Sequence, residues 1–159
     1  MSVVERVGLP PARGGRFAAV FPHSDDLAIF VGGTVLKLLA DGWSGVFIKT
    51  TNDDKDSYDL PASVTASRIH GETRELGDLL GLERVLELDY QNHYLQPSTL
   101  VELRHRLIVL FRLLRVDAVL TFDPWAPYEE NPDHVITAQA TEAACWMAGR
   151  HLDLPELGG

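Results

Sequence analysis

Two short segments of the sequence carry residue types that can bind a metal ion and activate a water molecule. The first is Pro22-His23-Ser24-Asp25-Asp26, where a histidine and an aspartate stand three residues apart directly after an apolar run. In a tight turn, an imidazole and a carboxylate with this spacing can converge on one cation, as they do in zinc sites. Asp25 would stand beside the ion, where it could accept a proton from the activated water. The alternative interpretation is a polar turn that caps the following helix.

The second segment runs from Asp123 to His134 and closes with the tetrapeptide Asn131-Pro132-Asp133-His134. Its first three residues suit the N-cap and first turn of a helix, so they need no other role. His134 has no part in such a cap. The helix dipole disfavours an imidazolium at this end, so we expect His134 to stay neutral and able to donate a lone pair to a metal.

The predicted metal site combines His23 and Asp26 from the first segment with His134 from the second. Three protein ligands leave one coordination position open for water, which is typical of a catalytic site rather than a structural one. We predict one Zn²⁺ per chain, although a histidine–aspartate–histidine site also accepts iron, cobalt or nickel.

The rest of the sequence alternates short apolar runs with longer helical patterns, which indicates the fold that positions these segments. Such alternation predicts an α/β, Rossmann-like, doubly wound sheet that is mostly parallel. A strand order of 3-2-1-4 would place the loops after the first and fourth strands at the switch point, where ligands bind. We expect an irregular lead-in over residues 1–15 and a single domain over 16–159. The expected strands are 16–21, 45–51, 85–89 and 117–122, and the expected helices are 32–40, 65–80, 98–115 and 132–151.

Composition narrows the classes of partner. The 159 residues carry a formal net charge of −9, which argues against a nucleic-acid binder and gives no support to an anionic membrane surface. No apolar run is long enough for a membrane span or a signal peptide, so a cytoplasmic protein is expected. Cys145 is the single cysteine and is expected to be a buried packing thiol. The sequence leaves open whether the protein forms a homo-oligomer.

The segments described above resemble the LmbE-like (PIG-L) zinc-dependent N-deacetylases. Residues 17–42, FAAVFPHSDDLAIFVGGTVLKLLADG, are similar to the family's opening, which carries a His-Pro-Asp-Asp signature after the first strand. Residues 68–81 resemble the family's second helix, and LTFDPW followed by NPDH resembles its fourth strand and His-Pro-Asp-His motif. The resemblance extends from about residue 16 to about residue 157.

The resemblance implies a zinc enzyme that removes an acetyl group from a small N-acetylglucosamine-type conjugate. It implies Asp25 as the general base and Asp133 as an orienting residue, and it assigns the metal to the same three ligands. Arg68 becomes a candidate substrate contact, with a surface ion pair to Glu72 as the alternative.

Five positions matter because they differ from the family pattern or lie near it. Asn131 replaces a histidine thought to protonate the leaving amine or to hold the oxyanion, and an amide cannot deliver a proton. Asn92 stands where an aspartate is common, and its neighbour His93 either supplies the missing acid or is simply solvated. Trp125 and Tyr128 either stack on a sugar ring or pack within their loop.

Two other functions remain open at this point. Family members usually continue with further strands that shape the substrate pocket, so we expect either a fragment or a minimal version, and a catalytically impaired metal- and sugar-binding relative is one alternative. A receiver-type signalling domain is the other, with Asp25, Asp26 and Asp89 as its acidic residues. That interpretation leaves His23 and His134 without a role.

Overall fold

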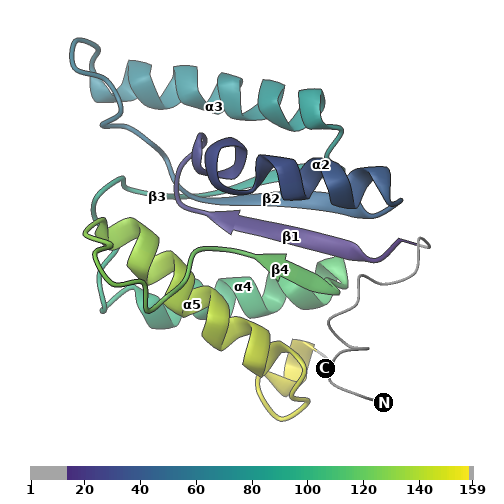
Figure 1. Cartoon of the computed structure of the whole chain (residues 1–159). Coiled ribbons are helices and arrows are strands. Elements are labelled where there is room, and N and C mark those ends of the chain that lie inside the picture. The colour runs from purple at the N-terminus through teal and green to yellow at the C-terminus, as the bar shows by residue number, and fades with distance from the viewer. Residues whose placement is uncertain (1–13, 158–159) are drawn as a thin grey trace.

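Four parallel strands form the centre of the computed structural model, which describes residues 14–157. The predicted lead-in therefore lies outside the described residues except for its last two. The strands stand in the order β3-β2-β1-β4, as the sequence predicts (Figure 1). They are β1 (Arg16–Phe21), β2 (Ser44–Thr51), β3 (Arg84–Tyr90) and β4 (Ala118–Leu120).

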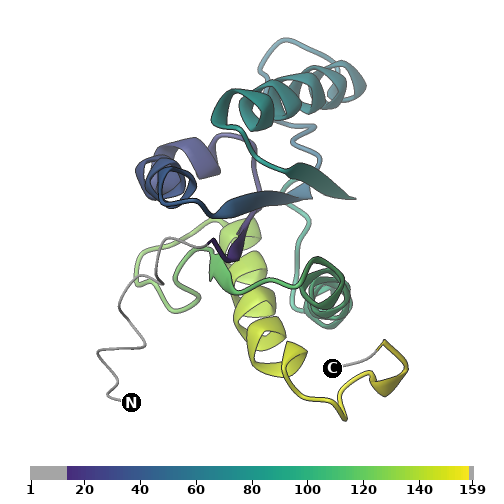
Figure 2. The ribbon, with the colours of Figure 1, turned by 90° about the vertical axis from the view of Figure 1, so that its right-hand side faces the viewer.

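Helices cover both faces of this sheet, so the predicted doubly wound α/β architecture is confirmed. Figure 1 shows α2 and α3 on one face and α4 and α5 on the other, and Figure 2 shows the strands between these two layers. The helical elements are η1 (Leu27–Val31), α2 (Gly32–Ala40), α3 (Ala62–Leu80), α4 (Leu100–Leu114), α5 (Pro132–Ala148) and the short η2 (Pro155–Leu157).

The side chains of β1 alternate between two apolar cores. Phe17, Ala19 and Phe21 belong to the core beneath α2, whereas Ala18 and Val20 belong to the core shared with α4 and α5. All five are fully buried. A central strand covered on both faces reads as a continuous apolar run, which is why RFAAVF was recognisable as a strand.

Two elements end two or more residues earlier than predicted. β4 pairs with β1 only from Ala118 to Leu120, because the chain then leaves the sheet edge and Phe122 packs edge-on against Phe21, with ring centroids 5.0 Å apart. The last helix ends at Ala148, where Gly149 provides the C-cap, rather than continuing to residue 151.

Two short elements, η1 and η2, were not predicted at all. Leu27–Val31 forms a π-helical turn between the first loop and α2, and it begins directly after Asp26. Single π turns are rare in proteins, and those that do occur are often found at functional sites. Here the turn places Ile29 and Phe30 at the surface next to the two predicted ligand loops.

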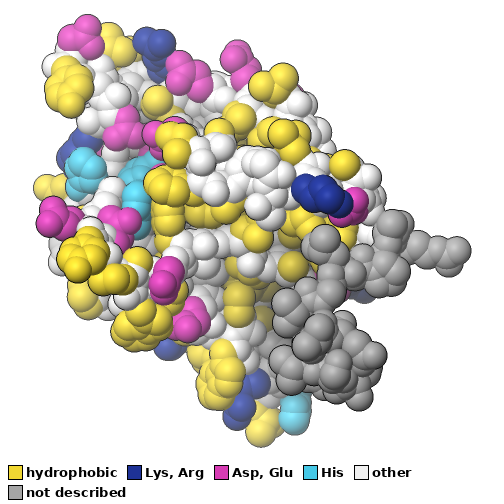
Figure 3. All heavy atoms as spheres, in the orientation of Figure 1, with side chains coloured by type: hydrophobic (Ala, Val, Ile, Leu, Met, Phe, Trp, Pro, Cys, Tyr) yellow, Lys and Arg dark blue, Asp and Glu magenta, His cyan; other side chains and the backbone are white. Residues whose placement is uncertain are grey.

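The strand order brings the two chemically unusual loops together. β1 and β4 are neighbours, so the loops after Phe21 and Leu120 leave the sheet side by side at the carboxyl ends of the strands. Histidine side chains gather there between acidic and hydrophobic ones (Figure 3). Within residues 14–157, no helix is both long enough and apolar enough to cross a membrane.

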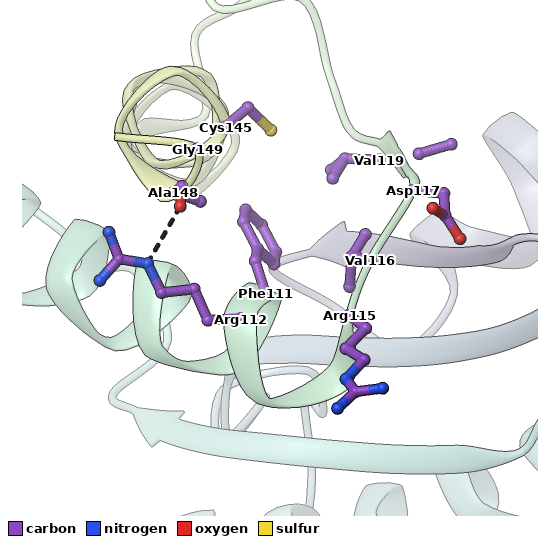
Figure 4. A pocket seen from close by; sticks show the side chains of 10 residues that line it. Phe111, Arg112, Arg115, Val116, Asp117, Val119, Cys145, Ala148 and Gly149 are labelled. Carbon is purple, nitrogen blue, oxygen red and sulfur yellow. Dashed lines mark hydrogen bonds between the residues drawn. The ribbon is translucent and has the colours of Figure 1, made fainter. Parts of the chain in front are cut away.

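A separate cavity of about 550 Å³ lies near the amino end of β4, between α4 and α5 (Figure 4). Its lining is largely apolar and includes Phe111, Val116 and Val119, with no histidine and only Asp117 as an acid, so it is not a metal site. Cys145 lines this cavity and is exposed. The prediction of a buried packing thiol was therefore wrong, because Cys145 faces this open cavity.

Candidate metal centre

Three side chains converge where the two loops meet, and they are the three predicted metal ligands. The Nδ1 atom of His23 lies 3.1 Å from Asp26 Oδ2 and 3.3 Å from His134 Nε2. The same His134 nitrogen lies 3.5 Å from Asp26 Oδ1. Ligands that bind Zn²⁺ tetrahedrally at 2.0–2.1 Å stand about 3.3 Å from one another. The donor atoms are thus spaced as a small divalent cation requires.

The first loop holds its two ligands through its own backbone. The carboxylate of Asp26 accepts a hydrogen bond from the His23 backbone N–H at 2.9 Å and also contacts the His23 ring. Both side chains are buried, at 7% and 4% exposure. The spacing of three residues therefore works because one carboxylate closes the turn and orients the imidazole at once.

Residues at the end of β2 hold the loop that carries His23 and Asp26 through hydrogen bonds to its backbone. Thr51 bonds to the Pro22 carbonyl through both its backbone N–H, at 3.1 Å, and its hydroxyl, at 2.8 Å. Asp53 Oδ2 accepts the Ser24 backbone N–H at 3.1 Å, and its other oxygen lies 2.8 Å from the same Thr51 hydroxyl, whose single proton the two acceptors share. Asp53 opens a stretch rich in charged residues directly after β2, yet it is fully buried.

Asp53 can be buried because a buried cation stands beside it. Lys49 Nζ lies 3.0 Å from Asp53 Oδ2 and 3.0 Å from Glu87 Oε2, and the lysine side chain is fully buried. Burial raises the pKa of the Asp53 carboxyl, and the Lys49 ammonium opposes that rise. This network was missed from the sequence, where Lys49 is an isolated charge at the end of an apolar strand.

The second histidine is held by the loop before α5. His134 Nδ1 lies 3.0 Å from Glu129 Oε2, while the other Glu129 oxygen accepts the Asn131 backbone N–H at 2.8 Å. Phe122 stacks on the His134 ring, with centroids 4.2 Å apart and planes 15° from parallel. Glu129 was not among the predicted site residues. Its position five residues before His134 has no regular spacing that would have revealed the contact.

Asp133 supports the first histidine and the loop after β3. Its carboxylate lies 3.4 Å from His23 Nε2 and accepts the backbone N–H groups of His93, at 2.6 Å, and Leu95, at 3.1 Å. Burial raises the pKa of Asp133, but its bonds to His23 and to these amides outweigh that effect and lower it. Asp133 is fully buried, so it orients its neighbours rather than touching a substrate.

The electrostatics of the centre favour a positive charge. Burial lowers the pKa of the His23 imidazole, but hydrogen bonds to Asp133 and Asp26 outweigh it and raise the pKa to about 10. Each histidine has a carboxylate beside the ring nitrogen that faces away from the other predicted ligands. This carboxylate belongs to Asp133 for His23 and to Glu129 for His134. Carboxylates in this position orient metal-binding histidines and increase their basicity.

The converging donors line an open pocket of about 370 Å³. Asp25 is exposed within this pocket, beside the three ligands. Asn131 also lines it, and its Oδ1 accepts the Asp133 backbone N–H at 3.0 Å as an N-cap. The lining residues are His23, Asp25, Asp26, Ile29, Phe30, Asp56, His93, Asn131 and His134.

Of the predicted substrate contacts His93, Asn92 and Arg68, only His93 lines this pocket. His93 lines the pocket, whereas Asn92 is fully buried beneath it, with Oδ1 3.2 Å from His23 Nε2. Arg68 forms the alternative ion pair with Glu72, at 2.8 Å, on the exposed surface of α3.

Two predicted aromatic contacts stand outside the pocket lining. Trp125 and Tyr128 belong to the loop between β4 and α5, with exposed fractions of 72% and 98%. This exposure argues against the alternative interpretation, in which the two rings pack within their loop. It does not by itself bring them to the ligands.

Fold and site together define an α/β protein with a histidine–aspartate–histidine cluster that could hold a metal ion at the sheet's switch point. The family model described as "PIG-L: GlcNAc-PI de-N-acetylase" matches residues 18–145. The chain belongs to the PIG-L family, as its motifs predict.

Three relatives illustrate this membership. The chain is 35% identical over 116 residues to a diacetylchitobiose deacetylase from Thermococcus kodakarensis, covering 71% of this chain and 42% of that protein. It is similar to the N,N'-diacetylchitobiose deacetylase of Pyrococcus horikoshii, solved with its inhibitor MPG, at a TM-score of 0.82 and 27% identity. That match covers 89% of this chain and 53% of the other.

The third relative is a conserved protein from Thermus thermophilus, with a TM-score of 0.72 and 25% identity. The match covers 87% of this chain and 58% of that one. The chain thus spans about half the length of the relatives that it matches.

Proposed function

We propose that this protein is a zinc-dependent hydrolase that removes the acetyl group from an N-acetylglucosamine-type conjugate. The observation that carries the proposal is the spacing of the donor atoms of His23, Asp26 and His134, between 3.1 and 3.5 Å, beside the exposed carboxylate of Asp25. Similarity to two diacetylchitobiose deacetylases supports the reaction and the class of substrate.

The residues present fit the zinc ion that the family implies. Two imidazole nitrogens and a carboxylate are ordinary zinc ligands, and both imidazoles have orienting carboxylates. When bound, the ion supplies Lewis acidity, which polarises the acetamide carbonyl and makes a coordinated water more acidic.

Asp25 acts as the general base in this proposal. Its side chain is exposed in the pocket rather than committed to an ion pair, so it can accept a proton from the attacking water. Its neighbour Asp26 is occupied by His23 and His134 and is not free for that role.

Asn131 is proposed to stabilise the oxyanion that develops on the acetyl oxygen. Its Oδ1 is fixed by the Asp133 backbone N–H, so the amide nitrogen is the group left to face a ligand in the pocket. A preorganised N–H donor of this kind is a usual component of an oxyanion hole. The exposed rings of Trp125 and Tyr128 are proposed to stack on the sugar.

A metal- and sugar-binding role without turnover is the second candidate. Asn131 favours it, because an amide cannot protonate a leaving amine. Membership of the PIG-L family argues against the receiver-type interpretation.

The test measures zinc by elemental analysis and acetate release from N,N'-diacetylchitobiose, in the wild type and in the Asp25→Asn variant. We expect about one zinc per chain in both proteins, and a loss of acetate release in the variant of about 10²–10⁴-fold. Full acetate release by a metal-loaded Asp25→Asn variant would contradict the mechanism. Zinc binding without any acetate release by the wild type would support the second candidate.

A further inference from the structure

We propose that His93 is the catalytic acid that protonates the leaving amine, an inference that rests on the proposed deacetylase function. His93 follows β3, on the far side of β2 from β4, yet its side chain lines the same pocket as Asp25, Asn131 and His134. Three separate loops therefore supply the pocket with a base, an amide donor and an additional imidazole.

The backbone of His93 is held in an unusual conformation by the metal centre itself. Its φ angle is +64°, a left-handed value that few residues other than glycine adopt. The buried carboxylate of Asp133 accepts the His93 N–H at 2.6 Å and the Leu95 N–H at 3.1 Å. The side chain of Asn92, one residue earlier, is tied to His23 Nε2 and, through its Nδ2, to Asp56 Oδ1 at 2.7 Å.

These contacts make the position of His93 a consequence of the site. Asp133 contacts His23 with the same oxygen that accepts the His93 N–H. Strained residues persist where the surroundings over-determine them, and they cluster at active sites. A solvated loop histidine needs neither a left-handed backbone nor a buried carboxylate on its amide.

The lining of the pocket leaves few other proton donors. His23, Asp26 and His134 are the proposed metal ligands, and Asn131 carries an amide that holds no transferable proton. Asp56 accepts a hydrogen bond from Asn92, and Asp25 is needed as the base. The two remaining lining residues, Ile29 and Phe30, are apolar. An imidazole is the side chain that most often delivers a proton near neutral pH.

The chemical step balances with these two groups. A water oxygen forms a bond to the acetyl carbon while its proton passes to Asp25, and Asn131 donates a hydrogen bond to the resulting oxyanion. The C–N bond then breaks, its electron pair goes to nitrogen, and the nitrogen takes the proton of His93. The products are the amine and acetic acid, which ionises. Solvent removes the proton from Asp25 and returns one to His93.

The test compares two substrates whose leaving groups differ in basicity. N,N'-diacetylchitobiose releases a basic alkylamine that must be protonated, whereas 4-nitroacetanilide releases a weakly basic aniline that needs little help. His93→Asn tolerates the left-handed backbone and keeps a donor but loses the acid. We expect kcat/KM to fall by about 10²–10⁴-fold for the sugar and by only a few-fold for the anilide. The matched control is His151→Asn at an exposed position outside the pocket, which should change neither value.

A second variant tests the imidazole directly. His93→Gly suits the positive φ and leaves space at the site, so added imidazole should restore much of the lost activity on the sugar. Zinc content should match that of the wild type in both variants. Equal losses of kcat/KM on both substrates, without rescue by imidazole, would overturn the role of His93 but leave the proposed deacetylase function standing. A wild-type protein that binds zinc and cleaves neither substrate would overturn the proposed function and this role with it.

Discussion

Glu129 lies outside the predicted ligand set but holds one of its members, His134. It contacts His134 Nδ1 at 3.0 Å and accepts the Asn131 backbone N–H at 2.8 Å, so it fixes the imidazole relative to the start of α5. Burial raises its pKa, but its bonds to Asn131 and His134 outweigh that effect and lower it. The carboxylate is therefore ionised at neutral pH and pairs with the imidazole N–H.

Replacing this carboxylate should weaken zinc binding without removing a ligand. In Glu129→Gln the side chain can still accept one hydrogen bond but no longer carries a charge opposite His134. We expect zinc affinity to fall by about 10–100-fold, measured by titration against a competing chelator. Glu130→Gln, at the exposed neighbouring position, is the control and should bind like the wild type. Equal affinities for the two variants would mean that Glu129 does not tune His134.

Asn131 combines a structural and a chemical role in one side chain, and two substitutions can separate them. Asn131→Asp keeps the N-cap acceptor but loses the amide donor, so unfolding free energy should change by less than about 0.5 kcal/mol while acetate release falls about 10²–10³-fold. Asn131→Ala should lose the same activity and also about 1 kcal/mol of stability. Undiminished acetate release by Asn131→Asp would exclude the amide as the oxyanion donor.

At the scale of elements, the end of β2 decides whether the ligand loop has a fixed shape. Lys49 in β2 and Glu87 in β3 form an ion pair across neighbouring strands, and Asp53 extends the network to the Ser24 backbone. Both Lys49 and Asp53 are fully buried, so neither charge can be compensated by water. The ligand loop is held as firmly as the sheet because its anchor lies within the sheet.

Removing the buried cation should therefore be costly. Lys49→Met has a similar volume but leaves the buried Asp53 without its cation, whereas Glu87 keeps its contact with His70, and we expect a loss of about 3–5 kcal/mol in the free energy of unfolding. Urea denaturation of the metal-free protein measures it. Lys37→Met removes an exposed ion pair with Asp41 on α2 and should cost less than about 1 kcal/mol. A similar small loss for Lys49→Met would show that the buried network is not what holds this part of the sheet.

The elements themselves were largely predictable from sequence, and the exceptions have physical causes. The mostly parallel, doubly wound sheet followed from the alternation of strands and helices, because right-handed crossovers between short apolar runs leave few arrangements, of which 3-2-1-4 was the one favoured. The π turn at Leu27–Val31 and the departure of Phe122 from the sheet depend on tertiary contacts that no local pattern records. The burial of Asp53 was hidden for the same reason, since its partner Lys49 is visible only once the strands are paired.

At the scale of the whole molecule, the metal centre ties together loops from three strands. His23 and Asp26 follow β1, His134 follows β4, and Asn92 and His93 follow β3, with Asp133 linking the last two loops. The convergence of His23, Asp26 and His134 was predictable because His-x-x-Asp and Asn-Pro-Asp-His are local motifs on loops that the fold brings together. The contact of the Glu129 carboxylate with His134 was not predictable, because it depends on how the irregular loop between β4 and α5 folds back.

This arrangement predicts that metal occupancy contributes to the stability of the folded chain, since an ion bound by segments over a hundred residues apart favours only the state in which they meet. Zinc at about 100 times its dissociation constant should stabilise the protein by about 2.7 kcal/mol, raising the melting temperature by roughly 5–10 °C over a chelator-treated sample. The His23→Ala/His134→Ala variant should show no such rise, whereas His105→Ala/His151→Ala should retain it. If both double variants respond to zinc like the wild type, the ion binds elsewhere, and the convergence of His23, Asp26 and His134 would need a different explanation.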